Sequence, residues 1–198
     1  MHYEKALREN LRQEMKKRRE QLHFEEISEL SAQICARVLA HPLLQSQQTV
    51  SSFVSFGHEV STFYLNIELK RRGHVLGLPV VSPSIKGLMD FYTFKEGVNF
   101  IPNRFNILEP PALPERKLDP KQFSLVLLPL TAFDETGARL GMGGGYYDRL
   151  LKALNPTCRK IGLAYDFQQA TNIPTENWDM PIDEVITPSR HLICAPLK

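Results

Sequence analysis

The chain has 198 residues, of which 42% are hydrophobic and 23% are charged, a balance typical of a folded globular protein. Its formal net charge of +2 is too small to predict a polyanionic partner. No apolar run reaches the ~20 residues that a membrane-spanning helix needs, so we expect no membrane association.

Two helices are predicted at the start of the chain, over residues 3–22 and 25–40. In the first, Leu7, Leu11 and Met15 recur at helical spacing. In the second, Ile34 and Val38 share one face. We expect both helices to pack on the outside of a central sheet.

A strand, a helix and a second strand are predicted next, over residues 48–56, 61–73 and 74–81. This order is a βαβ unit, in which the two strands pair in parallel. A further strand is predicted over residues 89–94, followed by a proline-rich surface excursion over residues 99–121.

The second half of the chain continues the alternation of strands and helices. The segment FSLVLLPL, residues 123–130, is continuously apolar, which is typical of a strand buried on both faces. A helix is predicted over residues 146–154, and further strands over 159–165, 183–188 and 191–196. The pattern predicts an α/β fold, a three-layer α/β/α sandwich with a mostly parallel central sheet, in a single domain over residues 1–198.

The three cysteines, Cys35, Cys158 and Cys194, are scattered and form no CxxC pair. This spacing indicates reduced, mostly buried thiols and no cysteine-based metal site. The first twenty residues are charged throughout and lack the apolar segment of a secretory signal. We therefore expect a cytoplasmic protein.

A glycine-rich segment, LGMGGGYYDRLL at residues 140–151, lies between a predicted strand and a predicted helix. In open parallel sheets, ligands bind beyond the carboxyl ends of the strands, and a helix start offers unpaired N–H groups to phosphate. The segment lacks the Gly-Lys-Ser/Thr end of a Walker A loop. A mobile surface loop is the alternative. Asp148 would then simply complement the helix dipole, and Arg139 would be a solvated charge.

The first helix carries a basic stripe. Arg8, Arg12 and Lys16 lie four residues apart and share one face, and Arg19 extends it. Three explanations stay open: a solvated face, a phosphate clamp for a ligand held elsewhere on the fold, and a nucleic-acid contact.

The segment SFGHEV, residues 55–60, follows the first predicted strand at the expected ligand-binding edge. Glu59 would face the site there. Alternatively the segment is only a turn that leads into the next helix, with Ser61 as its N-cap.

In this order, these segments resemble the 5-formyltetrahydrofolate cyclo-ligase family, also called 5,10-methenyltetrahydrofolate synthetases. The resemblance covers nearly the whole chain and rests on LRQEMKKRRE, SFGHEVST, NILEP, FDETGARLGMGGGYYDR and ENWDMPIDEVITP. It implies a three-layer sandwich and an ATP- and magnesium-dependent ligase that converts 5-formyltetrahydrofolate to 5,10-methenyltetrahydrofolate. We expect a monomer that binds these two small molecules and no nucleic acid.

The resemblance also implies roles for individual residues. ATP would be held by Arg8, Arg12, Arg139, Gly141, Met142, Gly143, Gly144, Gly145, Tyr146 and Tyr147. Catalysis would involve Arg139, Tyr147 and Asp148. Magnesium would be held by Asp148 and Asp179. The folate would contact Glu59, Met142, Gly143, Gly144, Gly145 and Tyr146. Some members carry Arg or Lys inside the loop, whereas Met142 and Gly144 bring no charge, so the first helix and Arg139 would supply more of the neutralisation.

The sequence leaves two rival functions. A nucleic-acid-binding protein would use the basic first helix, but the low net charge and the absence of a basic, aromatic-rich sheet count against it. A sugar-phosphate isomerase-like enzyme would share the fold class and need no ATP.

Overall fold

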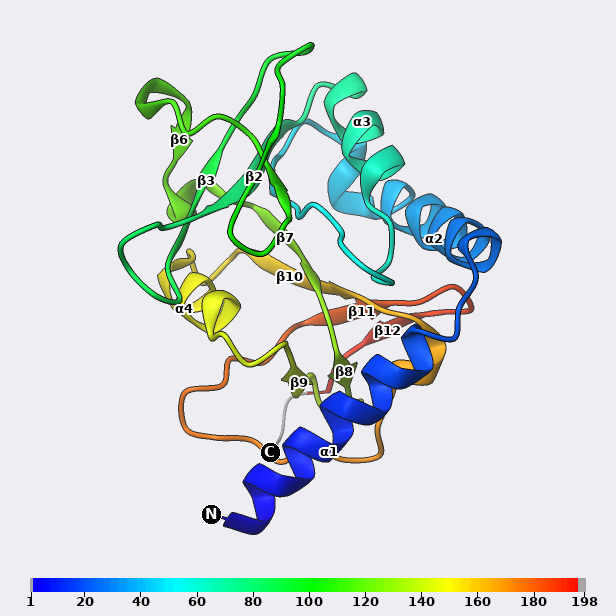
Figure 1. Ribbon diagram of the computed structural model, residues 1–198. Coiled ribbons are helices and arrows are strands. Elements are labelled where there is room, and N and C mark those ends of the chain that lie inside the picture. The colour runs from blue at the N-terminus through cyan, green and yellow to red at the C-terminus, as the bar shows by residue number, and fades with distance from the viewer. Residues whose placement is uncertain (1, 196–198) are drawn as a thin grey trace.

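The computed structural model describes residues 2–195 and is built around an eight-stranded sheet (Figure 1). The strands of this sheet are β1 (Thr49–Ser51), β2 (Val75–Val81), β3 (Met89–Tyr92), β6 (Lys117–Leu118), β7 (Leu125–Pro129), β10 (Arg159–Leu163), β11 (Glu184–Ile186) and β12 (His191–Ile193). Their order is β12-β11-β10-β7-β1-β2-β3-β6. The four pairings that join β11, β10, β7, β1 and β2 are parallel. The remaining pairings at the two edges are antiparallel, so the sheet is mostly parallel, as predicted.

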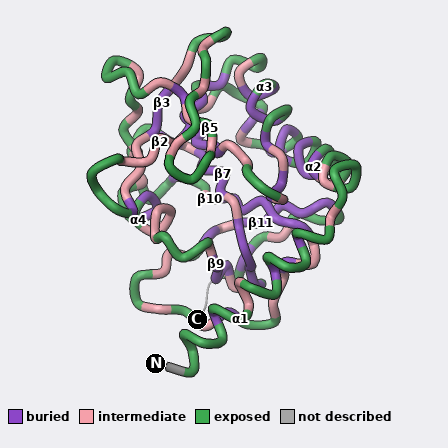
Figure 2. Tube along the Cα trace, viewed as in Figure 1, coloured by how far each residue is buried: buried purple, intermediate pink, exposed green. Residues whose placement is uncertain are grey.

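Helices cover both faces of this sheet (Figure 1). Helices α2 (Phe24–Leu39) and α3 (Phe63–Arg71) lie on one face, and α4 (Tyr146–Ala153) lies on the other. Strand β7 shows the division most clearly. Leu125 and Leu127 join the core under α2 and α3, whereas Val126 and Leu128 join the core under α4. All four residues are 0% exposed, which confirms the prediction of a strand buried on both faces (Figure 2). The helices on the two faces confirm the three-layer sandwich.

Helix α1 (His2–Arg19) does not lie on the sheet, and the prediction that both first helices would do so was wrong for this one. It packs against a hairpin formed by β8 (Ala132–Phe133) and β9 (Arg139–Leu140), beyond the carboxyl end of β7 (Figure 1). Its buried positions are Arg8, Met15 and Arg19, while Leu7 is 39% exposed. The buried face therefore includes two guanidinium groups, which need carboxylate partners rather than an apolar sheet face.

Other boundaries differ in detail from the predictions. The excursion over residues 99–121 contains a separate two-stranded sheet, β4 (Ile101–Pro102) with β5 (Leu108–Glu109), and β6, which returns to the main sheet. The N-cap of α3 is Thr62, not Ser61. The last strand ends at Ile193, and Pro196, where it was predicted to end, lies outside the described residues.

The cysteines behave as predicted. Cys35, Cys158 and Cys194 are free and buried, and burial raises the pKa of the Cys35 thiol to about 11. Among the described helices, none combines the length and the apolar character that crossing a membrane requires.

Candidate active site

The segment that links β9 to α4, residues 141–145, is called the glycine loop below. Gly143 and Gly145 have φ angles of 90° and 67°, in the left-handed region that side-chain-bearing residues rarely adopt. Gly145 is the N-cap of α4 and offers no side chain to the free N–H groups of the first turn. Within residues 2–195, the backbone N–H groups from Met142 to Tyr147 donate no hydrogen bond. A continuous row of unpaired N–H groups at a helix start is a site for an anion.

Arg139 lies at the base of this loop, on β9. Its side chain is only 4% exposed, and Nη2 donates a hydrogen bond to Oδ1 of Asp148 at 2.6 Å. Burial lowers the pKa of Arg139, and the charges of Asp148 and Asp179 oppose that shift. The buried Nε of Arg139 has no hydrogen-bond partner among the described residues. Because a buried unpaired donor is costly, this N–H group is well suited to a ligand acceptor.

Helix α1 brings Arg8 to the segment before β11. The guanidinium of Arg8 forms an ion pair with Asp179 and also donates to the carbonyl of Pro174 at 2.7 Å. The Glu176 amide donates to Asp179 at 2.8 Å. Burial would raise the pKa of Asp179, but the bonds from Arg8 and Glu176 outweigh it and hold this pKa below its usual value. Asp179 is therefore a carboxylate at neutral pH.

The two acids predicted to hold magnesium come from different elements but approach each other. The Met180 amide, next in sequence to Asp179, donates to Oδ1 of Asp148 at 3.3 Å. The other oxygen of Asp148 accepts no hydrogen bond from the described residues, so it fits a hard cation that prefers oxygen ligands. Asp179 uses both oxygens on Arg8, and would have to share them with an ion.

Glu59 and Tyr147 lie close enough for the charge of Glu59 to affect the pKa of Tyr147. Glu59 is 6% exposed, lies 3.9 Å from the guanidinium of Arg19, and accepts a hydrogen bond from the Phe56 amide at 3.3 Å. Burial raises the pKa of Glu59 to about 7, despite the opposing effects of Arg19 and of that hydrogen bond. Burial, aided by the charge of Glu59, raises the pKa of Tyr147, so its phenol stays protonated at neutral pH. Arg139 opposes that shift.

The outer side of the glycine loop is open. Met142 is 58% exposed, and Nη2 of Arg104 donates to the hydroxyl of Tyr146 at 3.0 Å. The ring of Phe105 stands edge-on to Tyr146 with centroids 6.5 Å apart. Two surface hollows elsewhere on the molecule, of about 470 and 440 Å³, include no residue of this loop.

The fold thus gathers the predicted residues from four separated segments. Arg8 and Arg12 come from α1, Glu59 from the turn after β1, the glycine loop with Arg139 and Asp148 from the middle, and Asp179 from the segment before β11. Each of these segments is linked to another by a hydrogen bond, an ion pair or a mutual effect on a pKa. Helix α1 is linked to the glycine loop through Arg12, whose Nε donates to the carbonyl of Gly141 at 2.9 Å.

Sequence reasoning missed three residues of this region. Arg19 was seen only as an extension of the basic stripe, whereas it is buried and pairs with Glu59. Arg104 belongs to the excursion, which was expected to be plain surface. Arg149 donates to loop carbonyls, although a cation in the first turn of a helix opposes the helix dipole. That unfavourable position was a signal available in the sequence.

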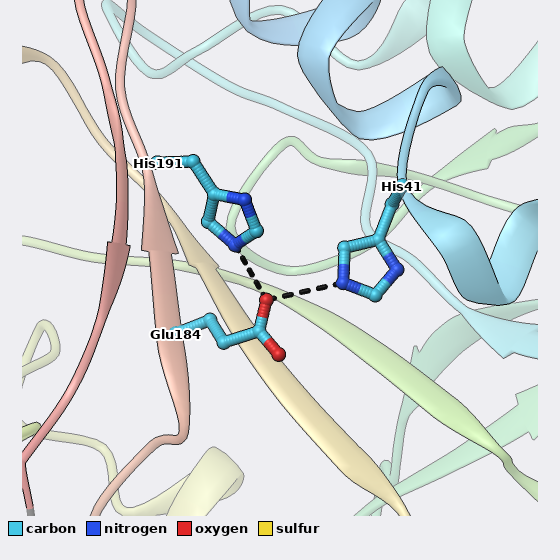
Figure 3. Close-up of side chains that lie close together, drawn as sticks. All are labelled: His41, Glu184 and His191. Atoms are coloured by element: carbon cyan, nitrogen blue, oxygen red, sulfur yellow. Dashed lines mark hydrogen bonds and ion pairs between the residues drawn. The ribbon is translucent and has the colours of Figure 1, made fainter.

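A separate cluster lies at the far edge of the sheet, where Glu184 of β11 meets His41 and His191 (Figure 3). Oε2 of Glu184 is 3.1 Å from Nε2 of His41 and 2.5 Å from Nε2 of His191, and Oε1 is 3.0 Å from Nε of Arg159. Nδ1 of His41 accepts a hydrogen bond from the Leu43 amide, which places the ring proton on Nε2. Because that nitrogen is a donor to Glu184, the cluster is a satisfied buried carboxylate rather than a metal centre.

Comparisons with known proteins agree on one family. The family model of the 5-formyltetrahydrofolate cyclo-ligase family matches residues 4–188. The 5-formyltetrahydrofolate cyclo-ligase of Escherichia coli K12 is 35% identical over 177 residues, which is 89% of this chain and 97% of that protein. The solution structure of Aquifex aeolicus 5,10-methenyltetrahydrofolate synthetase is 28% identical, with a TM-score of 0.83 over 97% of this chain and 95% of its own. A Mycoplasma pneumoniae 5,10-methenyltetrahydrofolate synthetase structure has the same fold, with a TM-score of 0.73, 24% identity, and coverage of 91% of this chain and 98% of its own.

Proposed function

The chain belongs to the 5-formyltetrahydrofolate cyclo-ligase family, an enzyme family of the ligase class, and from this premise we propose that it cyclises 5-formyltetrahydrofolate to 5,10-methenyltetrahydrofolate at the expense of ATP. In the proposed reaction, the formyl oxygen attacks the γ-phosphorus of ATP, the bond to the bridging oxygen breaks, and ADP leaves. N10 then attacks the formyl carbon and loses its proton. The carbon–oxygen bond breaks, and phosphate leaves with the bonding electrons.

The work of the protein in such a reaction is positioning and charge neutralisation. The row of unpaired N–H groups from Met142 to Tyr147 would receive the phosphates of ATP. Arg139 would add its unpaired Nε to the same anion. The hydrogen bond to Asp148 fixes the guanidinium of Arg139, so the orientation of this group does not depend on the substrate.

Helix α1 would supply the rest of the neutralisation. Arg12 lies beside the loop, since its Nε is bonded to the carbonyl of Gly141. Arg8 is paired with Asp179, and its positive charge would stabilise the phosphates from the far side of that carboxylate. Asp148, with Asp179 beside it, would hold magnesium, which when bound lowers the charge of the triphosphate and favours phosphoryl transfer.

Glu59 would hydrogen-bond the pterin ring. With a pKa of about 7, it is able to accept or donate a proton at a ring nitrogen near neutral pH. The protonated phenol of Tyr147 is a neutral donor next to it. Tyr146 and the open side of the glycine loop, with Met142, would contact the remainder of the folate.

The observation that carries this proposal is the row of unpaired loop amides that follows buried Arg139, whose Nε is also unpaired, within the part of the chain that the family model matches. The test is to mix the protein with Mg-ATP and 5-formyltetrahydrofolate and to follow the absorbance of methenyltetrahydrofolate. Reactions without ATP, or with ADP in its place, are the controls. An absence of ATP-dependent product refutes the proposal.

No observation favours the two rival functions. Arg8 and Arg19 of the basic stripe are buried in ion pairs, which removes them from a surface that a nucleic acid would contact. Membership in a ligase family counts against a sugar-phosphate isomerase. We further propose that the enzyme acts as a cytoplasmic monomer, to be checked by gel filtration and fractionation.

A further inference from the structure

We propose that Arg149 is a positioning residue that turns the N–H groups of the glycine loop toward the phosphates. This inference rests on the proposed function, because it assigns a role in the same ATP site. Arg149 lies in the first turn of α4, where its charge opposes the positive end of the helix dipole. An arginine in that position needs a compensating interaction.

The compensation is a set of backbone carbonyls. Nη1 of Arg149 donates to the carbonyl oxygens of Gly145 at 3.0 Å, Gly144 at 3.3 Å and Gly87 at 3.3 Å. The first two belong to the glycine loop. Gly87 belongs to the connection between β2 and β3, so one guanidinium joins two segments that are distant in sequence.

The orientation of the amides follows from the planarity of the peptide bond. In a trans peptide, the carbonyl and the N–H of the same unit point in opposite directions. Because Arg149 holds the carbonyls of Gly144 and Gly145, the N–H groups of Gly145 and Tyr146 point away from it. These two groups belong to the unpaired row in the described chain. Arg12 acts in the same way on the carbonyl of Gly141, and so orients the N–H of Met142.

Arg149 is an exposed residue, but its Nη1 lies close to the backbone of two glycines. A Cβ added at Gly87 would lie 2.2 Å from Nη1 of Arg149, and one added at Gly145 would lie 2.8 Å from it. Both glycines also have positive φ angles, of 80° and 67°. The glycines thus leave room for Arg149, and Arg149 in turn fixes a loop that glycines alone would leave free to rotate.

The test compares Arg149→Met and Arg149→Lys with the wild type. The dissociation constant for Mg-ATP is measured by calorimetry well below the melting temperature, together with KM for each substrate. Methionine removes the donor, and we expect the dissociation constant and the KM for ATP to rise about tenfold, in line with the loss of a charge-assisted contact. Lysine has a donor but a shorter reach, so it should restore part of the affinity.

The matched control is Arg71→Met. Arg71 is an arginine on α3 whose side chain is 69% exposed and forms a local ion pair with Glu68. It should leave both constants unchanged. Unchanged ATP affinity in both Arg149 variants, with or without a fall in melting temperature, overturns the positioning role alone while the wild type still forms product. A wild type that binds no nucleotide overturns this role and the proposed function together.

Discussion

The pKa of Glu59 depends strongly on the surroundings in which the fold places its carboxyl group. The residue follows β1 in a turn that reads as ordinary loop sequence, yet its carboxyl is almost completely buried beside Arg19. Burial raises its pKa from 4.5 to about 7, so the folded protein binds a proton more tightly than the unfolded chain does. The sequence gives the residue type, but not the depth at which the fold places it.

This raised pKa predicts a pH dependence of stability. Between pH 4.5 and pH 7 the folded state binds more protons at Glu59 than the unfolded state, so stability should fall as pH rises through that window. The effect is at most about 3 kcal/mol. Glu59→Gln should remove this slope. Urea unfolding of both proteins at pH 5, 6, 7 and 8 measures it, and parallel pH profiles would contradict the prediction.

Asp148 accepts a hydrogen bond from Arg139 and would also bind the proposed magnesium. Asp148→Asn should lower turnover more than it weakens folate binding, because the lost charge acts on phosphoryl transfer. The variant should also need more magnesium to reach half of its maximal rate. Steady-state rates over a magnesium titration test this. Normal activity at limiting magnesium would leave Asp148 only as the partner of Arg139.

At the scale of elements, α1 contributes to the site as well as to packing. Arg12→Ala should raise the KM for ATP about tenfold or more, since a hydrogen bond to a charged group contributes roughly 1.5–3 kcal/mol. The fold should remain intact because Arg12 is only partly buried. Lys16→Ala is the control on the same helix, since Lys16 is 64% exposed and forms an ion pair with nearby Glu20. Equal ATP kinetics in the two variants would count against a role for Arg12.

The glycine loop permits a sharper comparison. Gly145→Ala forces an alanine to a φ of 67° and presses against Arg149, so it should cost about 1–2 kcal/mol of stability and most of the stabilisation by Mg-ATP. Gly73→Ala imposes similar strain at a φ of 82°, with nothing within 4 Å of the new methyl. It should lower the melting temperature but keep the full Mg-ATP shift. A full shift in Gly145→Ala would show that the loop does not admit a phosphate.

The elements themselves were largely predictable, but their contacts were not. The apolar run over residues 123–130 and the βαβ spacing identify the buried strand and the parallel pairing, because both depend on local pattern. The place of α1 could not be predicted from its apolar row, since Arg8 and Arg19 are buried with acids that lie far along the chain. Nor could the sequence show that the excursion brings Arg104 to Tyr146. Such pairings arise from tertiary packing, which no local pattern records.

At the scale of the whole molecule, the Glu184 cluster fastens the edge of the sheet to the segment after α2 (Figure 3). Glu184→Ala leaves Arg159 and two histidines without their acceptor, and should cost about 3 kcal/mol. Urea unfolding gives this value. Catalytic constants at 25 °C should stay unchanged, since the cluster shares no residue with the glycine loop. Glu20→Ala, at an exposed pair, should cost less than about 1 kcal/mol.

The ion pair between Arg8 and Asp179 spans 171 positions in the chain. On the ribosome, the first helix is made early, but its carboxylate partner is made near the end. Until then, burying the Arg8 guanidinium leaves its charge unpaired, so the contact of α1 with the segment before β11 cannot form, although Met15 already has its partners in the β8–β9 hairpin. Translation that stops before residue 179 therefore yields a product that has the glycine loop but lacks the Arg8–Asp179 ion pair beside it.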